Sequence, residues 1–236
     1  MRKLLTSSAR TLASLARPLL YRLYRLPSVR QRALYVVYGP GYRKWLEVNP
    51  GETLPDREAL YRFIFEREGL DCPIDYLEFG VYKGSSIRWW LEKNCHPESR
   101  FVGFDCFDGL PEKWGEMPEG TFSTFGAVPE VADERCSFVK GYFQDTLPNW
   151  LISRDFRRKT IVHLDADLYS STLLVLLQVL PRLKRGDIII FDEFGSYLDE
   201  YRALVDATVA YPIEFTAVGQ NLMASGYCQR VAIKIK

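Results

Sequence analysis

From residue 54 onward, short apolar runs alternate with segments whose apolar residues recur at helical spacing. Helices are expected at about 56–69, 84–94 and 171–184. The apolar runs predict strands at about 75–79, 100–105, 136–140, 160–165, 187–192, 213–217 and 228–235. Such alternation predicts an α/β domain with a mostly parallel sheet and helices on both faces, in which the last two strands form an antiparallel hairpin at one edge.

The first fifty residues follow a different pattern. Leucines recur from Leu4 to Leu26 at steps of about three and four residues, with arginines between them, which predicts a basic amphipathic helix. Pro40-Gly41 and Pro50-Gly51 indicate a linker. We therefore expect residues 1–50 to be a helical extension and linker, and residues 51–236 to be the main domain.

Charge is divided unevenly between these two parts. The whole chain carries a net charge of only +1, which gives no argument for a nucleic-acid partner. Residues 1–50 hold ten basic residues and one acid, whereas residues 51–236 hold 21 basic and 29 acidic residues. The basic helix is suited to peripheral contact of residues 1–30 with an anionic membrane surface or with a partner. A cap on the domain, a homo-oligomer interface and an organelle transit peptide are the alternatives.

Cysteine usage and hydropathy indicate the compartment. The five cysteines include no CxxC pair and no compact framework, which argues against a zinc knuckle or a disulfide scaffold. The arginines interrupt the apolar N-terminal residues, so neither a membrane-spanning helix nor a usual secretory signal is expected. These features predict a cytoplasmic protein, and the basic helix adds the expectation of peripheral attachment at the inner face of a membrane.

The first predicted strand ends in a glycine-containing turn. In an open parallel sheet, ligands bind beyond the carboxyl ends of the strands. Gly80 and Gly84 would let the backbone approach a ligand, and the following helix start offers free N–H groups to a carboxylate. The turn lacks the GxGxxG pattern, which lowers the case for a dinucleotide, and by itself it could be an ordinary turn.

The next two strand ends carry polar side chains suited to a nucleoside. Asp105 closes the second strand, where a carboxylate can accept hydrogen bonds from both hydroxyls of a ribose. Gln144 follows the third strand and can offer a donor and an acceptor to an adenine edge. Alternatively, Asp105 is a helix cap and Gln144 belongs to an ordinary helix start.

Acidic residues cluster at the fourth and fifth strand ends. Asp165 and Asp167 follow one strand, and Asp192 and Glu193 close the next. If these strands are neighbours in the sheet, their carboxylates converge, and clustered acids need a cation, a proton or a basic partner. Oxygen ligands suit Mg²⁺, Mn²⁺ or Ca²⁺, so we expect a metal site, with helix capping as the alternative.

At these residues the chain resembles class I S-adenosylmethionine methyltransferases, and among them the macrocin O-methyltransferase family of metal-dependent sugar methylases. Catechol O-methyltransferase is a more distant likeness. The resemblance implies a Rossmann-like, seven-stranded sheet with one antiparallel edge strand. It covers about half the chain through LEFGVYKGSS at 77–86, FVGFDCFDGLP at 101–111, VKGYFQDTLP at 139–148, LDADLYSST at 164–172 and GDIIIFDEF at 186–194.

The resemblance also implies roles for individual residues. The cofactor S-adenosylmethionine would contact the glycine turn, the ribose acid, the adenine-side glutamine and the first acid after the fourth strand. These residues are Glu78, Gly80, Tyr82, Gly84, Ser86, Asp105, Gln144 and Asp165. Magnesium would be held by Asp165, Asp192 and Glu193, the last of which stands where these families commonly have Asp or Asn.

The resemblance assigns no general base, because Leu168 stands where catechol methylases have lysine. We expect Asp165 or Asp167 to accept the proton in preference to His163. Strand alternation predicts that His163 points away from the acids, and a lone histidine in a buried strand is usually a core residue. Trp114 and Phe122 of the 106–126 loop, together with Tyr169, are candidates to line the acceptor pocket or to close over the cofactor.

The sequence therefore predicts methyl transfer from S-adenosylmethionine to a metal-chelated hydroxyl of a small molecule. A cation lowers the pKa of a bound hydroxyl, and two adjacent hydroxyls can chelate it, so a vicinal diol is the expected acceptor and a sugar is favoured by the resemblance. Two alternatives remain: another Rossmann-type enzyme, such as a nicotinamide oxidoreductase, and a non-catalytic module that binds a membrane surface.

Overall fold

The computed structural model describes residues 18, 22–23, 25–152, 154–223 and 228–236. The chain divides into two compact units, residues 1–44 and 45–236. Most of the amphipathic helix predicted from Leu4 to Leu26 lies outside the described residues. Among those that are described, no helix combines the length and the apolar character needed to cross a membrane.

The long helix α2 (Pro27–Val48) begins in the first unit and continues into the second. Pro40 and Gly41, which we expected to mark a linker, lie inside this helix, so that prediction was wrong. A proline within a helix removes only one backbone donor, and the flanking turns can continue past it. The helix ends at Val48, just before Asn49 and Pro50, because a residue that precedes proline disfavours helical geometry.

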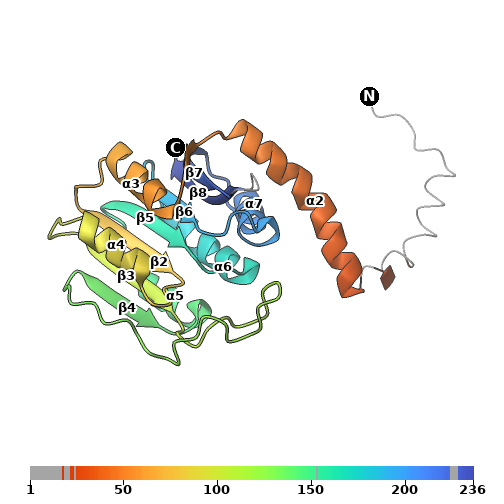
Figure 1. The fold of residues 1–236 in the computed structure, drawn as a ribbon, viewed down its shortest axis with the longest axis horizontal. Helices are drawn as coiled ribbons and strands as arrows, with labels where there is room; N and C mark the ends of the chain where they lie inside the picture. The colour runs from red at the N-terminus through yellow and green to blue at the C-terminus, as the bar shows by residue number, and fades with distance from the viewer. Residues whose placement is uncertain (1–17, 19–21, 24, 153, 224–227) are drawn as a thin grey trace. The chain divides into compact units, whose positions relative to one another are not determined.

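The second unit is built on an eight-stranded sheet with the order β1-β7-β8-β6-β5-β2-β3-β4 (Figure 1). Strand β8 is antiparallel to both β6 and β7, and all other neighbouring strands are parallel. The strands are β1 (Glu52–Leu54), β2 (Ile74–Phe79), β3 (Arg100–Asp105), β4 (Cys136–Lys140), β5 (Lys159–Leu164), β6 (Ile188–Phe191), β7 (Phe215–Leu222) and β8 (Cys228–Ile235).

This topology confirms the Rossmann-like fold class and the terminal hairpin, and it changes two details. The sheet has eight strands and not seven, because Glu52 to Leu54 pair with β7; three residues are too few to give a strand pattern in the sequence. The antiparallel strand was expected at the edge, but β8 lies between β7 and β6. The short β1 therefore forms the edge of the sheet on that side.

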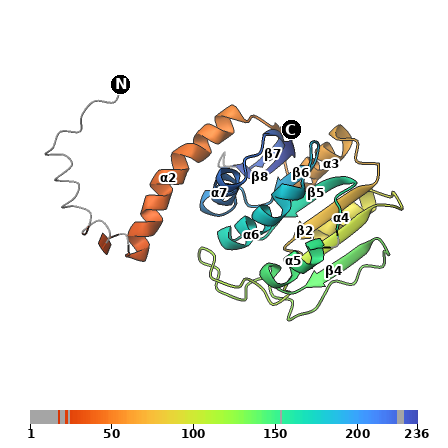
Figure 2. The ribbon, with the colours of Figure 1, turned by 180° about the vertical axis from the view of Figure 1, so that it is seen from behind.

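Helices cover both faces of the sheet (Figures 1 and 2). On one face, the ring of Trp90 in α4 packs against Tyr76 of β2. On the other, the ring of Phe143 in α5 meets Phe79 of β2 edge-on. Tyr76 and Phe79 are three residues apart on one strand and therefore point to opposite faces. The helices of this unit are α3 (Arg57–Arg67), α4 (Ser85–Lys93), α5 (Phe143–Ile152), α6 (Tyr169–Val179) and α7 (Arg202–Ala210).

Backbone hydrogen bonds align the carboxyl ends of the central strands. The Gly80 N–H donates to the carbonyl of Phe104, and the Asp165 N–H donates to the carbonyl of Phe79. The Asp192 N–H continues the row by donating to the carbonyl of Leu164. Successive strand ends of β3, β2, β5 and β6 are thus level with one another, so the residues that follow them meet at one edge of the sheet.

Candidate active site

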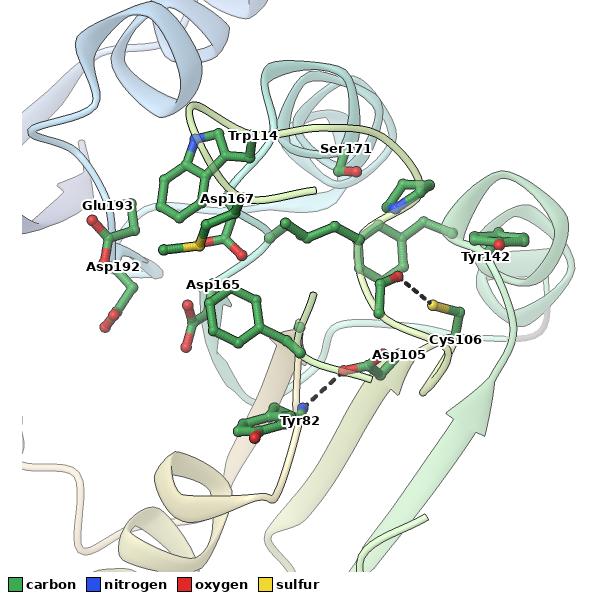
Figure 3. A pocket seen from close by; sticks show the side chains of 18 of the residues that line it. Tyr82, Asp105, Cys106, Trp114, Tyr142, Asp165, Asp167, Ser171, Asp192 and Glu193 are labelled. Atoms are coloured by element: carbon green, nitrogen blue, oxygen red, sulfur yellow. Dashed lines mark hydrogen bonds between the residues drawn. The ribbon is translucent and has the colours of Figure 1, made fainter. Parts of the chain in front are cut away.

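A cavity of about 460 Å³ opens at this edge of the sheet (Figure 3). Its volume falls in the usual range of small-molecule sites. In Figure 3 the acids Asp165, Asp167, Asp192 and Glu193 lie at one end of the cavity, Tyr142 lies at the other, and Asp105 lies between them. The predicted site residues that line it are Gly80, Tyr82, Asp105, Gln144, Asp165, Asp167, Asp192 and Glu193, whereas Glu78, Gly84 and Ser86 do not.

The glycine at position 80 is required by the close approach of β2 and β5. Its φ is +91°, and a Cβ placed on it would lie 1.8 Å from the backbone oxygen of Asp165. Tyr82, two residues later, also has a positive φ, 51°, which is unfavourable for a residue with a side chain. The turn is therefore held in a strained conformation at the cavity wall, as is common at ligand sites.

Asp105 holds this turn in place. Its Oδ2 accepts hydrogen bonds from the N–H groups of Val81 and Tyr82, both at 2.8 Å, and its Oδ1 accepts one from Phe107 at 2.7 Å. A carboxylate has about four acceptor positions, two on each oxygen, so Oδ1 can still accept a hydrogen bond from a ligand hydroxyl. Asp105 thus combines the capping role with the capacity to bind a ribose.

Asp167 reaches the cavity from a strained turn. The Leu168 N–H donates to the carbonyl of Ala166 at 2.5 Å, which closes a three-residue turn around Asp167, whose φ is 57°. Burial raises the pKa of Asp167 to about 7, and the negative charges of Glu193 and Asp192 add to the effect. A bound cation would reverse the effect of these charges.

The acids beyond β5 and β6 differ in how their charge is balanced. Burial, followed by the charge of Asp192, raises the pKa of Asp165 well above its ordinary value. Burial also opposes ionisation of Asp192, but His163 and Arg230 outweigh it and hold the pKa of Asp192 well below its usual range. Arg230 binds Asp192 through two contacts, Nε–Oδ1 at 2.9 Å and Nη2–Oδ2 at 3.1 Å.

A cation is therefore compatible with this end of the cavity. Within the described part of the chain, no basic side chain forms an ion pair with Asp165, Asp167 or Glu193. Candidate ligand atoms of Asp165, Asp192 and His163 lie within 4.8 Å of one another. Glu193 is absent from that closest group, although it lines the same cavity.

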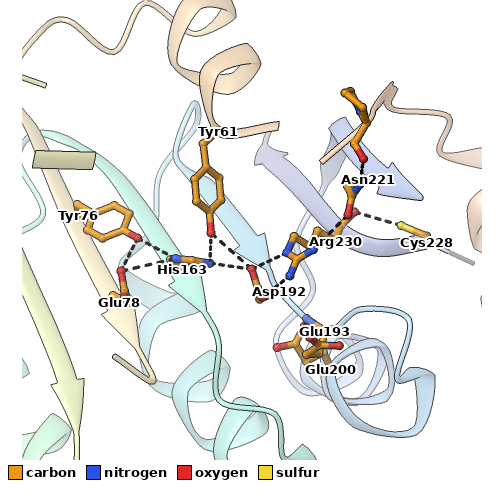
Figure 4. A network of polar contacts seen from close by, with 11 residues as sticks. Tyr61, Tyr76, Glu78, His163, Asp192, Glu193, Glu200, Asn221, Cys228 and Arg230 are labelled. Atoms are coloured by element: carbon orange, nitrogen blue, oxygen red, sulfur yellow. Dashed lines mark hydrogen bonds and ion pairs between the residues drawn. The ribbon is translucent and has the colours of Figure 1, made fainter. Parts of the chain in front are cut away.

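His163 lies behind the cavity in a buried polar network (Figure 4). Its Nδ1 is 2.7 Å from the Tyr76 hydroxyl, and its Nε2 is 3.2 Å from the Tyr61 hydroxyl and 3.5 Å from Asp192 Oδ1. Tyr76 also donates to Glu78 Oε2 at 2.7 Å. The histidine is thus a core residue with satisfied partners, as we expected, and it links Glu78 of β2 with Asp192, which follows β6.

The prediction that His163 points away from the acids was wrong. Residues two apart on a strand point to the same side, so His163 and Asp165 share a face. Burial opposes protonation of His163, but its contacts with Asp192 and Glu78 outweigh this and raise the pKa to about 9. A charged imidazolium therefore balances these two buried carboxylates.

Glu200 is a buried acid that the sequence pattern did not indicate. It lies in a short π-helix (Tyr197–Tyr201), and its Oε2 accepts a hydrogen bond from the Glu193 N–H at 2.8 Å. Its Oε1 has no hydrogen-bond partner among the described residues. Burial, followed by the charges of Asp192 and Asp165, raises the pKa of Glu200 well above its ordinary value. Glu200 therefore stabilises the backbone after β6 from behind.

The loop over residues 106–126 covers the cavity with apolar side chains. Trp114, Met117 and Phe122 line it, which confirms the expected placement of Trp114 and Phe122. The Trp114 Nε1–H donates to Asp199 Oδ2 at 3.1 Å and so joins the loop to the π-helix. Tyr169 does not line the cavity, contrary to the sequence prediction, because its hydroxyl donates to Asp206 at 2.9 Å.

Residues 65–210 match the model of the macrocin O-methyltransferase (TylF) family. A tetracenomycin-C 4'-O-methyltransferase of Streptomyces olivaceus is 28% identical over 52% of this chain and 54% of its own length. Demethyldecarbamoylnovobiocin O-methyltransferase of Streptomyces niveus is 32% identical over 58% of this chain and 62% of its own. The matched segments thus span about half to three-fifths of these relatives.

Solved structures support the fold. The crystal structure of the calicheamicin methyltransferase CalS11 superposes with a TM-score of 0.53 over 84% of this chain and 91% of its own, at 20% identity. The O-methyltransferase NovP gives 0.53 over 85% and 95%, also at 20% identity. The family match covers well over half of the sequence, and its strand-end motifs lie where the fold requires them. This chain belongs to the macrocin O-methyltransferase family.

Proposed function

We propose that this chain transfers a methyl group from S-adenosylmethionine to a hydroxyl of a sugar or a glycosylated small molecule. One observation carries the proposal: a single cavity combines the strand-end residues Gly80, Asp105 and Gln144 with the acids after β5 and β6. The two Streptomyces relatives support it, since their names describe O-methylation of a rhamnosyl-bearing tetracenomycin and of demethyldecarbamoylnovobiocin. A nicotinamide oxidoreductase and a non-catalytic module have no comparable support.

The proposed cofactor site lies in the part of the cavity that is lined by residues at the ends of β2 and β3 and at the start of α5. Asp105 Oδ1 has acceptor capacity left for a ribose hydroxyl, and Gln144, which lines the same cavity, is the proposed partner of the adenine edge. Gly80 and Tyr82 would lie beside the methionine portion. Three residues that do not line the cavity would act indirectly, by shaping the turn behind the methionine portion: Glu78, Gly84 and Ser86.

For the cation, Asp165, Asp192 and Glu193 are the proposed ligands, with Mg²⁺ preferred over Mn²⁺ or Ca²⁺. The unbalanced carboxyl groups favour a divalent ion, which would lower the pKa of an acceptor hydroxyl and fix its direction. Arg230 already engages Asp192 from the β8 side, so we expect Asp165 and Glu193 to provide the more accessible oxygens.

Asp167 is the proposed proton acceptor, with Asp165 as the alternative. Its turn directs the carboxyl group into the cavity next to the acids, while the aromatic loop covers the opening and excludes water. When bound, S-adenosylmethionine supplies an activated methyl group, so the remaining task of the chain is to hold the hydroxyl in line and to remove its proton.

Calorimetry and radiolabel transfer test the proposal. The wild-type chain should bind S-adenosylhomocysteine, and Mg²⁺ should stimulate methyl transfer to sugar nucleotides or glycosylated acceptors. Asp165→Asn should abolish the Mg²⁺ stimulation, whereas the exposed, surface-paired Asp155→Asn should leave it intact. Absence of S-adenosylhomocysteine binding by the wild-type chain would refute the assignment, and an Asp165→Asn variant with unchanged Mg²⁺ response would refute the metal site.

For residues 1–30 we propose peripheral attachment to the anionic inner face of a membrane, in an otherwise cytoplasmic protein with no nucleic-acid partner. The concentration of basic residues in this segment supports the proposal. Anionic vesicles should sediment the full chain at low salt and release it at high salt. Sedimentation that ignores salt, or that persists after removal of residues 1–30, contradicts it. The alternative is that this segment forms a homo-oligomer interface, and the molar mass measured by light scattering tests that alternative.

A further inference from the structure

Arg57 is a cation in an otherwise acidic cavity. It begins α3 and lines the cavity described above. Among the cavity-lining residues that the structure describes, no other is Lys, Arg or His. The acids that line the same cavity are Asp105, Asp165, Asp167, Asp192 and Glu193. No sequence pattern singled out Arg57.

The start of α3 fixes where Arg57 lies. The Asp56 side chain caps the helix by accepting a hydrogen bond from the Ala59 N–H at 2.8 Å. One turn further along the same helix face, the Tyr61 hydroxyl lies 3.5 Å from Asp192 Oδ1. Arg57 therefore approaches the cavity at its β6 end, where the carboxyl groups gather, and not at the end lined by Gln144.

The guanidinium of Arg57 has no protein partner within the described residues. No hydrogen bond or ion pair joins it to another described side chain, and the neighbouring Asp56 is occupied as the helix cap. By contrast, Arg230 on the other side of the same acids is fully paired with Asp192. Arg230 is thus engaged by Asp192, whereas Arg57 remains available to a ligand in the cavity.

Ligand chemistry explains an available guanidinium at this position. A carboxylate or phosphate entering an acidic cavity is repelled unless a cation receives it, and the planar guanidinium binds such groups with two parallel hydrogen bonds. The methionine portion of S-adenosylmethionine ends in a carboxylate. If its adenine lies near Gln144, the methionine extends along the sheet edge toward β6.

We infer that Arg57 is the anion-binding residue of this cavity and receives the carboxylate of the cofactor's methionine portion. An anionic group on the acceptor is the other source of the same chemistry. The inference rests on the proposed function for the identity of the cofactor, and on the position of Arg57 for the binding of an anion.

Three ligands tested by calorimetry separate these sources. S-adenosylhomocysteine carries the carboxylate, 5'-methylthioadenosine lacks the amino-acid portion, and inorganic pyrophosphate is an anion without a nucleoside. Each is titrated into the wild-type chain, Arg57→Met and Arg57→Lys. Arg62→Met, an exposed arginine of the same helix, is the matched control.

Arg57→Met should weaken S-adenosylhomocysteine binding by about tenfold or more, as expected for a lost charge-assisted contact, and leave methylthioadenosine binding unchanged. The affinity of Arg57→Lys for S-adenosylhomocysteine should lie between those of the wild-type chain and Arg57→Met. If only pyrophosphate binding is lost, the anion belongs to the acceptor. Equal weakening of both adenosine ligands, or no change with any ligand, overturns the inference. A wild-type chain that binds neither adenosine ligand refutes the proposed function, while pyrophosphate still tests Arg57.

Discussion

Replacing Gly80 with alanine should separate two strand ends on which the site depends. The new Cβ would lie 1.8 Å from the Asp165 oxygen and 2.7 Å from its carbonyl carbon. Ordinary contact begins at 3.4 Å, so the backbones of β2 and β5 would have to move apart by roughly 1.6 Å, the difference between these distances. Both contact atoms belong to the backbone and have no rotamer to escape into.

The magnitude follows from two costs. A left-handed backbone at a non-glycine residue costs about 1–2 kcal/mol. The separation also weakens the hydrogen bonds of Gly80 to Phe104 and of Asp165 to Phe79, each contributing about 1 kcal/mol. The free energy of unfolding should therefore fall by about 3–4 kcal/mol. Since Asp165 lies at the affected strand end, S-adenosylhomocysteine affinity should fall as well.

Gly69→Ala is the matched control for this experiment. Gly69 also has a positive φ, +60°, but nothing lies within 4 Å of a Cβ built there, so only the conformational cost applies. Urea denaturation followed by circular dichroism measures both variants. If Gly80→Ala destabilises the chain no more than Gly69→Ala does, the close approach of β2 and β5 does not require glycine, and the argument from strand-end packing fails.

Two further perturbations test the covering loop and a peripheral ion cluster. Trp114→Phe removes the donor to Asp199 and should raise KM for the acceptor several-fold while the Kd of S-adenosylhomocysteine stays constant; a parallel rise in both contradicts the loop's role. Burial opposes ionisation of Glu68, but two lysines lower its pKa below the ordinary 4.5. The ionised side chain should therefore stabilise the fold fully above about pH 5, and the stabilisation should decline as the pH falls through the folded-state pKa. Urea denaturation measures it as the difference in free energy of unfolding between the wild-type chain and Glu68→Gln. A difference that does not change with pH contradicts this prediction.

Much of the site was predictable because its signals are local. The apolar runs locate the central strands, and in a parallel sheet the residues after those strands must meet at one edge. Asp105, Gln144, Asp165 and Asp192 follow from that rule alone, and each lines the cavity.

The partners of these residues were not predictable. Arg230 lies on β8, 38 residues beyond the acid it binds, and reaches it because β8 is inserted between β6 and β7. Glu200 lies well beyond the end of β6, and Arg57 comes after β1, whose three residues give no strand pattern in the sequence, so the strand-end rule does not find them. Tyr169 looked like a pocket residue from its motif, but the face of α6 on which it lies directs it to Asp206.

The sequence by itself determined the α/β fold class, the strand-end positions of the cavity acids and the resemblance to sugar methylases, because periodicity and turn chemistry are properties of neighbouring residues. Only the tertiary structure decided which charges balance one another. His163 between Glu78 and Asp192, and Arg230 beside Asp192, depend on sheet order and strand register. Those pairings join residues far apart in the chain, and no local pattern encodes them.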